Sequence, residues 1–240
     1  MDRYVIDTYP PTDLLVADGL EWLVHEAIVK GTTDAAVLVP EVQSIPNLSG
    51  GAGRALSKQD RQFFRDGLDI QVLVARKPPH AFRGPVLVVW ANSDMAAQAE
   101  HMDPPAICAT GWERDGLGDW VRVWGATDPR TGEHFAPEVP EPAVVGAVAS
   151  ISFHMPGDVL HPSDKARAVD ALRALKLCDH KIDPPMIRAL AIQRGWIPRA
   201  ADRLADLAKK FALGKAVQGG TKMTKTRAKA MVARFEETDS

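Results

Sequence analysis

The residues of this chain that could do chemistry lie just after three short apolar runs. They are mostly acids, and they comprise Glu41, Asn92, Ser93, Asp94, Glu113 and Asp115. Ligands of open α/β sheets bind beyond the carboxyl ends of the strands. Three or four carboxylates that meet there would hold Mg²⁺, as phosphodiester hydrolysis requires. The same side chains also serve as helix caps and solvated loop residues, so we assign no catalytic residue, no metal site and no cofactor from this pattern.

Two further patterns are less specific. The glycines of SGGAGR (49–54) would let backbone N–H groups approach a phosphate, but the segment lacks the lysine of a P-loop and the G-x-G-x-x-G spacing. We interpret it as a surface loop. His154, Asp158 and His161 lie around a Pro-Gly turn without the third and fourth ligands of a zinc site. We interpret them as part of a loop at a domain junction.

The two cysteines, Cys108 and Cys178, lie in apolar surroundings. They are expected to be buried free thiols of a reducing compartment. No apolar run is long enough to span a membrane, and the N-terminus lacks the apolar core of a secretory signal. The sequence therefore predicts a cytoplasmic protein.

The first part of the chain alternates apolar runs with helical segments. The runs are predicted strands at 35–40, 68–76, 85–91 and 105–112. Helices are expected at 20–29, at 57–67 with Ser57 as N-cap and Gly67 as C-cap, and after the run 85–91 with Asn92 or Ser93 as N-cap. The run DWVRVW (119–124) suits either a helix or a strand, with a slight preference for a helix. This alternation predicts an α/β domain with a partly parallel sheet and short helices.

A small all-α bundle is predicted to follow the α/β domain. Its four amphipathic helices are expected at 163–176, 184–194 and 199–213 and after a Thr224 cap, with the flexible link GKAVQGGTK (214–222) before the last. We place the two domains at 1–157 and 158–240. The first of them includes an apolar helix expected at 143–153.

Within the bundle, Ala191 to Gly195, followed by Trp-Ile-Pro and a helix, resembles the helix-turn-helix motif over about 25 residues. The resemblance implies that the helix from Arg199 is a recognition helix, with Arg199, Asp202 and Arg203 nearest the base edges. A packed helical pair without a role in DNA binding and a protein-docking bundle remain the alternatives.

Charge is divided unevenly along the chain. Residues 1–160 hold 12 Lys and Arg against 22 Asp and Glu, whereas residues 161–240 hold 17 against 9. Some of the later cations have acidic neighbours on their own helices, but the excess from Lys209 to Arg234 does not. The predicted nucleic-acid contacts are Arg199, Arg203, Lys209, Lys210, Lys215, Lys222, Lys225, Arg227 and Lys229.

Three functions are compatible with these features. The leading hypothesis is a non-enzymatic nucleic-acid-binding or regulatory protein that contacts DNA or RNA through its basic C-terminal helices. The second is an α/β enzyme, a metal-dependent hydrolase or an enzyme with a phosphate-bearing ligand, with its site near Glu41, Asp94 and Glu113. The third is a self-assembling protein whose acidic and basic parts pair between subunits.

Overall fold

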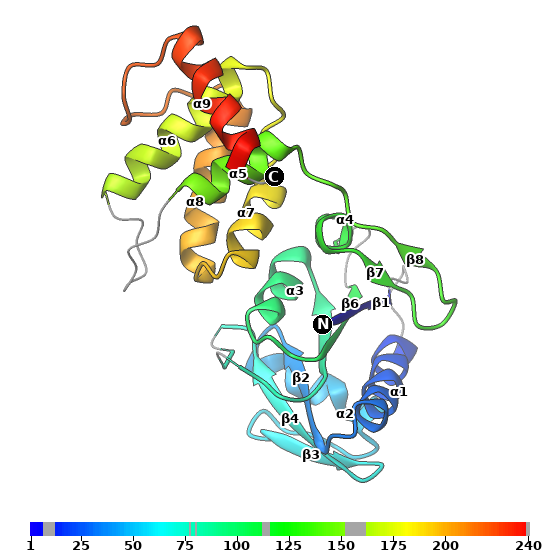
Figure 1. The fold of residues 1–240 in the computed structure, drawn as a ribbon. Coiled ribbons are helices and arrows are strands. Elements are labelled where there is room, and N and C mark those ends of the chain that lie inside the picture. Colours follow the sequence, from blue (N-terminus) through cyan, green and yellow to red (C-terminus); the bar gives the residue numbers. More distant parts are fainter. Residues whose placement is uncertain (7–12, 77, 80, 112–115, 152–161, 239–240) are drawn as a thin grey trace. The chain divides into compact units, whose positions relative to one another are not determined.

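The computed structural model describes the chain except for residues 7–12, 77, 80, 112–115, 152–161 and 239–240 (Figure 1). The chain forms two compact units, an N-terminal unit (Met1–Glu138) and a C-terminal unit (Val139–Ser240). The division lies earlier than the boundary at 157 and 158 that we expected. Helix α5 (Pro142–Ser150), which we had placed in the first domain, packs against α9 (Lys225–Thr238) in the C-terminal unit.

An eight-stranded sheet forms the centre of the N-terminal unit. Its strands are β1 (Asp2–Ile6), β2 (Asp34–Val39), β3 (Gln62–Arg65), β4 (Leu68–Val74), β5 (Val86–Ala91), β6 (Ala106–Gly111), β7 (Ala126–Thr127) and β8 (His134–Phe135). The spatial order is β3-β4-β2-β5-β6-β1-β7-β8. The six inner strands pair in parallel, and β3 and β8 pair antiparallel at the edges. The predicted α/β fold with a partly parallel sheet is therefore confirmed.

Helices cover both faces of this sheet (Figure 1). They are α1 (Asp13–Val29), the 3₁₀ helix η1 (Val42–Leu48), α2 (Ser49–Ala52), α3 (Ser93–Glu100) and α4 (Gly118–Trp124). Leu20 of α1 packs with Val37 on one face, and Trp120 of α4 packs with Val88 on the other. Because both faces are covered, β2, β5 and β6 are nearly continuous apolar runs. DWVRVW is helical, as we preferred.

The predicted helix at 57–67 is wrong, because these residues form a turn and then strand β3. The backbone N–H and the hydroxyl of Ser57 both donate to Asp60 Oδ2, at 2.6 and 2.7 Å. This turn competes with a helix for the same groups, and its hydrogen bonds lower the pKa of Asp60 to about 2. Phe63 is buried and Phe64 exposed, an alternation of period two that suits the pairing of β3 with β4.

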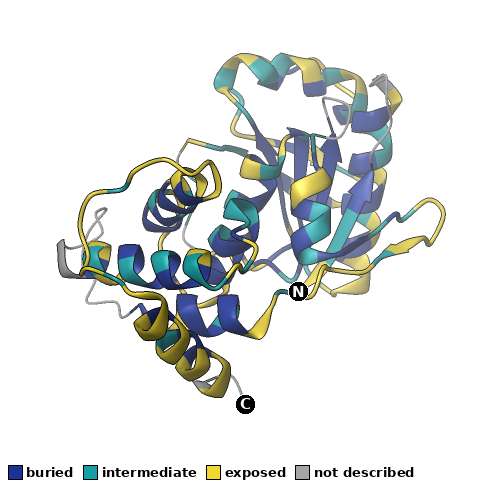
Figure 2. Cartoon of the chain, turned by 90° about the horizontal axis from the view of Figure 1, so that it is seen from above, coloured by how far each residue is buried: buried dark blue, intermediate teal, exposed yellow. Residues whose placement is uncertain are grey.

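The C-terminal unit is the predicted helical bundle. With α5 and α9 it contains α6 (Pro162–Leu177), α7 (Pro184–Gln193) and α8 (Pro198–Ala212). Its core is apolar, with the buried residues Val144, Val169, Leu172, Leu190, Leu204, Phe211, Val232 and Phe235. Asp183 caps α7 by accepting from Met186 N at 3.2 Å. Figure 2 shows that α9 buries one narrow stripe and is exposed along the rest of its surface.

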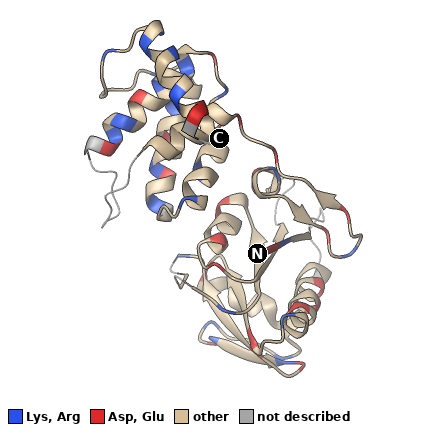
Figure 3. Cartoon of the chain, viewed as in Figure 1, with Lys and Arg blue, Asp and Glu red and all other residues tan. Residues whose placement is uncertain are grey.

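The two units carry opposite net charges. The N-terminal unit has 12 Lys and Arg against 20 Asp and Glu, and the C-terminal unit has 17 against 11. Figure 3 shows Lys and Arg along the helices of the C-terminal unit, with the acids of α9 gathered at the end of that helix. Among the described residues, no helix has both the length and the apolar character that crossing a membrane requires.

Candidate functional site

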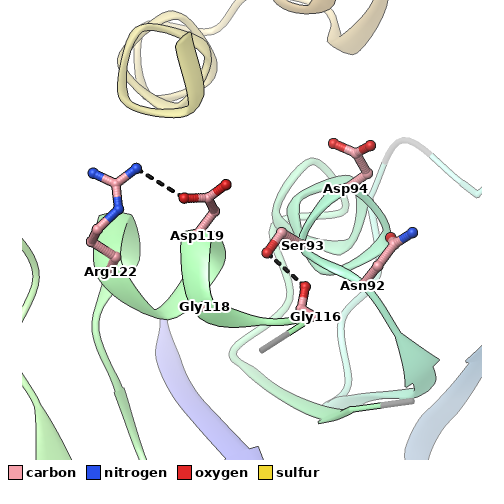
Figure 4. Close-up of a pocket in the computed structure, with 7 residues that line it drawn as sticks. All are labelled: Asn92, Ser93, Asp94, Gly116, Gly118, Asp119 and Arg122. Atoms are coloured by element: carbon pink, nitrogen blue, oxygen red, sulfur yellow. Dashed lines mark hydrogen bonds and ion pairs between the residues drawn. The ribbon is translucent and has the colours of Figure 1, made fainter. Parts of the chain in front are cut away.

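A pocket of the N-terminal unit with a volume of about 520 Å³ lies at the starts of α3 and α4, and α3 directly follows the end of β5 (Figure 4). Its described lining residues are Asn92, Ser93, Asp94, Gly116, Gly118, Asp119 and Arg122. The structure thus brings together three of the residues that we expected at this edge of the sheet. Glu41 does not line this pocket, and it is the exposed residue that precedes η1. Glu113 and Asp115 lie outside the described residues.

Two of these three residues have structural roles. Asn92 caps α3, because its Oδ1 accepts a hydrogen bond from Met95 N at 2.9 Å. The Ser93 hydroxyl donates to Gly116 O at 2.9 Å and accepts from Trp120 N at 3.1 Å, so it joins α3 to α4. Asp94 is exposed in the first turn of α3. It is therefore the predicted residue that is best placed to meet a ligand.

Asp119 and Arg122 complete the pocket, and the sequence analysis did not identify them. In DWVRVW we considered only the tryptophans and valines. The spacing of three residues between Asp119 and Arg122, however, is typical of an ion pair on a helix. Arg122 pairs with Asp119 at 3.0 Å and with Glu138 at 2.6 Å. In Figure 4 the side chains of Asp94, Asp119 and Arg122 project to the same side. The pocket therefore presents mixed charge, which suits a small polar ligand.

A distortion of β5 sets the position of these residues. The register between β5 and β6 shifts between Val88 and Ala91, and Trp90 has a φ of 52°. Its backbone N–H donates to the buried Thr110 hydroxyl at 3.3 Å. Such bulges change the direction of a strand and often lie beside functional sites. Nothing in the sequence predicts this bulge, because it depends on how β5 pairs with β6.

The structure adds little support for a chemical role of the remaining candidate residues. Within the described residues, no group of three or more His, Cys, Asp or Glu could hold a metal ion. His154, Asp158 and His161 lie outside the described residues. Both cysteines are free. Cys108 is buried in β6, and burial raises the pKa of its thiol well above the usual value, whereas Cys178 is half-buried rather than buried as expected.

The glycine-rich segment 49–54 is not the surface loop that we expected, because residues 49–52 form α2. Gly51 packs against α1, where an added Cβ would lie 2.6 Å from a methyl of Leu20 and 3.2 Å from one of Val16. Its carbonyl also accepts a hydrogen bond from Arg65. Close packing therefore explains this glycine without a phosphate.

The segment that resembles a helix-turn-helix forms two helices, α7 and α8, joined at Gly195. Gly195 has a φ of 80°, and Trp196 N donates to the carbonyl of Ala191 at 3.1 Å. Arg188 of α7 pairs with Asp202 of α8 at 2.6 Å. Asp202 therefore contributes to the packing of the helical pair, although we had placed it near the base edges.

The nine predicted nucleic-acid contacts lie on the surface of the C-terminal unit. Arg203 is half-buried and the other eight are exposed. Seven of them form what we call the basic segment, which consists of Lys209, Lys210, Lys215, Lys222, Lys225, Arg227 and Lys229. It extends from the end of α8, through the connection 213–224, into the first half of α9. In the described structure, none of the seven forms an ion pair with an acidic residue.

The charges of α9 oppose its helix dipole. Lys225, Arg227 and Lys229 lie in the first half of the helix, and Glu236 and Glu237 lie near its end. The dipole favours anions at the N-terminus of a helix and cations at its C-terminus. Helix stability therefore does not account for this arrangement. On α8, by contrast, Lys209 and Lys210 lie in the last turn, where the dipole favours them.

Comparison with known proteins bears on the C-terminal unit alone. Residues 140–235 match a family that is described as a domain of unknown function, DUF1889. The match begins at the second residue of the C-terminal unit and ends within α9. No curated protein and no solved structure matches the chain.

Proposed function

We propose that the C-terminal unit binds nucleic acid through the basic segment. The observation that carries the proposal is a set of seven exposed cations within residues 209–229 that lack acidic partners among the described residues. Lysine and arginine side chains of this kind neutralise phosphates and release counterions, which gives affinity without sequence choice. The free cysteines support a cytoplasmic location.

The arrangement of α9 adds to this argument. The N-terminus of a helix attracts anions through its unpaired N–H groups and its dipole. Three cations within the first five residues of α9 increase that attraction, at a small expense in helix stability. A phosphate backbone near the start of α9 would use both contributions.

The helix-turn-helix resemblance concerns the other end of α8. If α8 acts as a recognition helix, replacing Arg199 or Arg203 should relax the discrimination between sequences. Replacing residues of the basic segment should instead weaken binding to all sequences about equally. Competition between two duplexes of different sequence separates these two roles.

Neutralising the start of α9 is expected to reduce the salt dependence of binding. In Lys225→Gln/Arg227→Gln/Lys229→Gln, the slope of log K against log salt should become shallower by about 2 to 3, because each lost phosphate contact contributes about 0.7 to 0.9. Fluorescence anisotropy with a labelled duplex and a labelled single strand, over a range of salt concentrations, measures this slope.

The matched control removes three exposed cations from the N-terminal unit, as Lys58→Gln/Arg76→Gln/Arg83→Gln. It should leave the slope unchanged. Equal slopes for the two triple variants, or no binding by the unmodified protein even at low salt, would contradict the proposal. Sedimentation at the same salt concentrations distinguishes it from self-assembly of acidic and basic parts, since a monomer at every salt concentration excludes such assembly.

A second candidate is an enzyme that acts on a phosphate-bearing substrate, and the pocket at the starts of α3 and α4, beyond the carboxyl end of β5, supports it. The expected result is turnover of a phosphate-bearing substrate that Asp94→Asn removes. Asp69→Asn, an exposed change in β4, is the control. Turnover that persists in Asp94→Asn contradicts this candidate.

A further inference from the structure

The connection between α8 and α9, residues 213–224, is bound to α6 although its sequence predicted a flexible link. Arg173 of α6 donates hydrogen bonds to three carbonyl groups of the connection. Its Nη1 donates to Thr221 O at 2.8 Å, and its Nη2 donates to Val217 O at 3.3 Å and to Gly219 O at 3.1 Å. One guanidinium therefore fixes the backbone at three points.

Asp170, one turn earlier on α6, binds the same connection. Its Oδ1 accepts from Thr221 N at 2.7 Å, and its Oδ2 accepts from the Thr221 hydroxyl at 3.0 Å. Gly220 has a φ of 71°, and a Cβ there would overlap the Asp170 carboxylate and lie 3.0 Å from a methyl of Val169. The connection can therefore approach α6 this closely because residue 220 is glycine.

These contacts help to determine where Lys222 of the basic segment lies, whereas the backbone of Lys215 is held by α8, because its N–H donates to Lys210 O at 2.9 Å. Lys215 and Lys222 are exposed at either end of the bound stretch 217–221, and Lys222 is close in sequence to the start of α9. A free link of this length would sample many conformations, and binding would have to order it. Ordering the link in advance removes that entropic cost from association.

We propose that Asp170 and Arg173 are positioning residues for polyanion binding, which hold Lys222 in a fixed arrangement with the cations of α9. This inference rests on the proposed function. It assigns Asp170, an acid, a role that favours the binding of an anion. Simple electrostatics predicts the opposite effect for Asp170, which makes the inference testable.

The test compares Asp170→Ala with Asp170→Asn, using a labelled nucleic-acid duplex as the probe. Both variants remove the same negative charge, but only asparagine keeps an oxygen that can accept from Thr221 N. We expect Asp170→Asn to bind the duplex at least as tightly as the unmodified protein. We expect Asp170→Ala to bind more weakly, with a salt slope shallower by about 1 because Lys222 loses its fixed place.

Hydrogen exchange gives a second readout, because protection of the Thr221 amide should be lost in Asp170→Ala and kept in Asp170→Asn. Asp206→Ala, which removes an exposed acid of α8, controls for charge alone and should bind no more weakly than the unmodified protein. Gly220→Ala disturbs the connection without changing α6. It should also weaken binding, and it carries the test if Asp170→Ala does not fold.

The outcomes separate the two proposals. Equal affinity and slope for Asp170→Ala and Asp170→Asn, with the unmodified protein still binding, would overturn the positioning role and leave the proposed function intact. The same holds if Gly220→Ala binds as tightly as the unmodified protein. Absence of binding by the unmodified protein overturns the proposed function, and the positioning role with it.

Discussion

Replacing Gly146 by alanine is expected to destabilise the C-terminal unit, although alanine is the better helix former. Gly146 lies in α5 where this helix meets α9. An added Cβ would lie 2.7 Å from the Cα of Phe235 and closer still to its carbonyl group. These are backbone atoms, so no flexible side chain can move aside. The two helices must separate to admit a methyl group.

Helix propensity and the steric clash change the stability in opposite directions when Gly146 is replaced by alanine. Propensity alone would raise the free energy of unfolding by about 1 kcal/mol in Gly146→Ala. Overpacking a well-packed interface costs about 1 to 3 kcal/mol, and the separation would also expose part of Val232 and Phe235, which are buried. We expect a net loss for alanine and a larger loss for valine, measured by urea unfolding with far-UV circular dichroism.

The control is Gly50→Ala in α2, where the added Cβ would meet open space. It should leave the free energy of unfolding unchanged or slightly higher. A Gly146→Ala protein as stable as the unmodified one would contradict the close approach of α5 and α9. If the basic segment binds nucleic acid as we propose, loss of this packing should also weaken that binding, because α9 carries three of its cations.

Replacing Glu100 by alanine is expected to cost about 3 to 5 kcal/mol of the stability of the N-terminal unit. The Glu100 side chain is 2% exposed. It accepts hydrogen bonds from Arg3 at 2.8 and 3.0 Å and from the Trp120 indole at 3.1 Å, and the Arg3 guanidinium lies 4.8 Å from the ring centroid of Trp124. Alanine would leave Arg3 and Trp120 without this acceptor inside the structure.

The size of this effect can be checked by urea unfolding with tryptophan fluorescence. Glu100→Gln is the comparison, because its amide oxygen still accepts a hydrogen bond and fills nearly the same volume. It should therefore cost less than Glu100→Ala. If the two variants unfold at the same urea concentration as the unmodified protein, the buried pair does not stabilise this unit.

The contribution of Glu100 to the stability of the N-terminal unit changes with pH in a definite direction. Burial raises the pKa of the Glu100 carboxyl, against the opposing effects of Arg3 and Trp120. The folded state then binds the proton more tightly than the unfolded state. The stability that comes from this tighter proton binding is fully present below the ordinary glutamate pKa of about 4.3. It is lost as the pH rises through the pKa of Glu100 in the folded state. The difference in free energy of unfolding between the unmodified protein and Glu100→Gln should therefore decrease as the pH rises through this range.

Local sequence signals predicted most of the elements. The runs that became β2, β5 and β6 are nearly continuous apolar sequences, as strands covered on both faces require, whereas β4 begins with alternating buried and exposed residues. The signals failed at Ser57 and Asp60, whose side chains suit a helix cap and a tight turn equally well. There the pairing of β3 with β4 decided the outcome.

The candidate sites were predictable to a smaller extent. Asn92, Ser93 and Asp94 were identified because they follow a strand, and the exposure of the basic segment follows from the charge of its side chains. Asp119 and Arg122 were missed because their part in the pocket depends on how α4 lies beside α3. The positions of Asp170 and Arg173 in the sequence also did not indicate that these residues bind the connection 213–224.

The sequence by itself determined the apolar runs, the caps at Asn92 and Asp183 and the division of charge, because each depends on residues close together in the chain. Only the tertiary structure decided the pocket, the approach of Gly146 to Phe235 and the contacts of Asp170 with Thr221. These join residues far apart in the sequence, and hydrogen bonds and steric fit across such distances leave no local periodicity to detect.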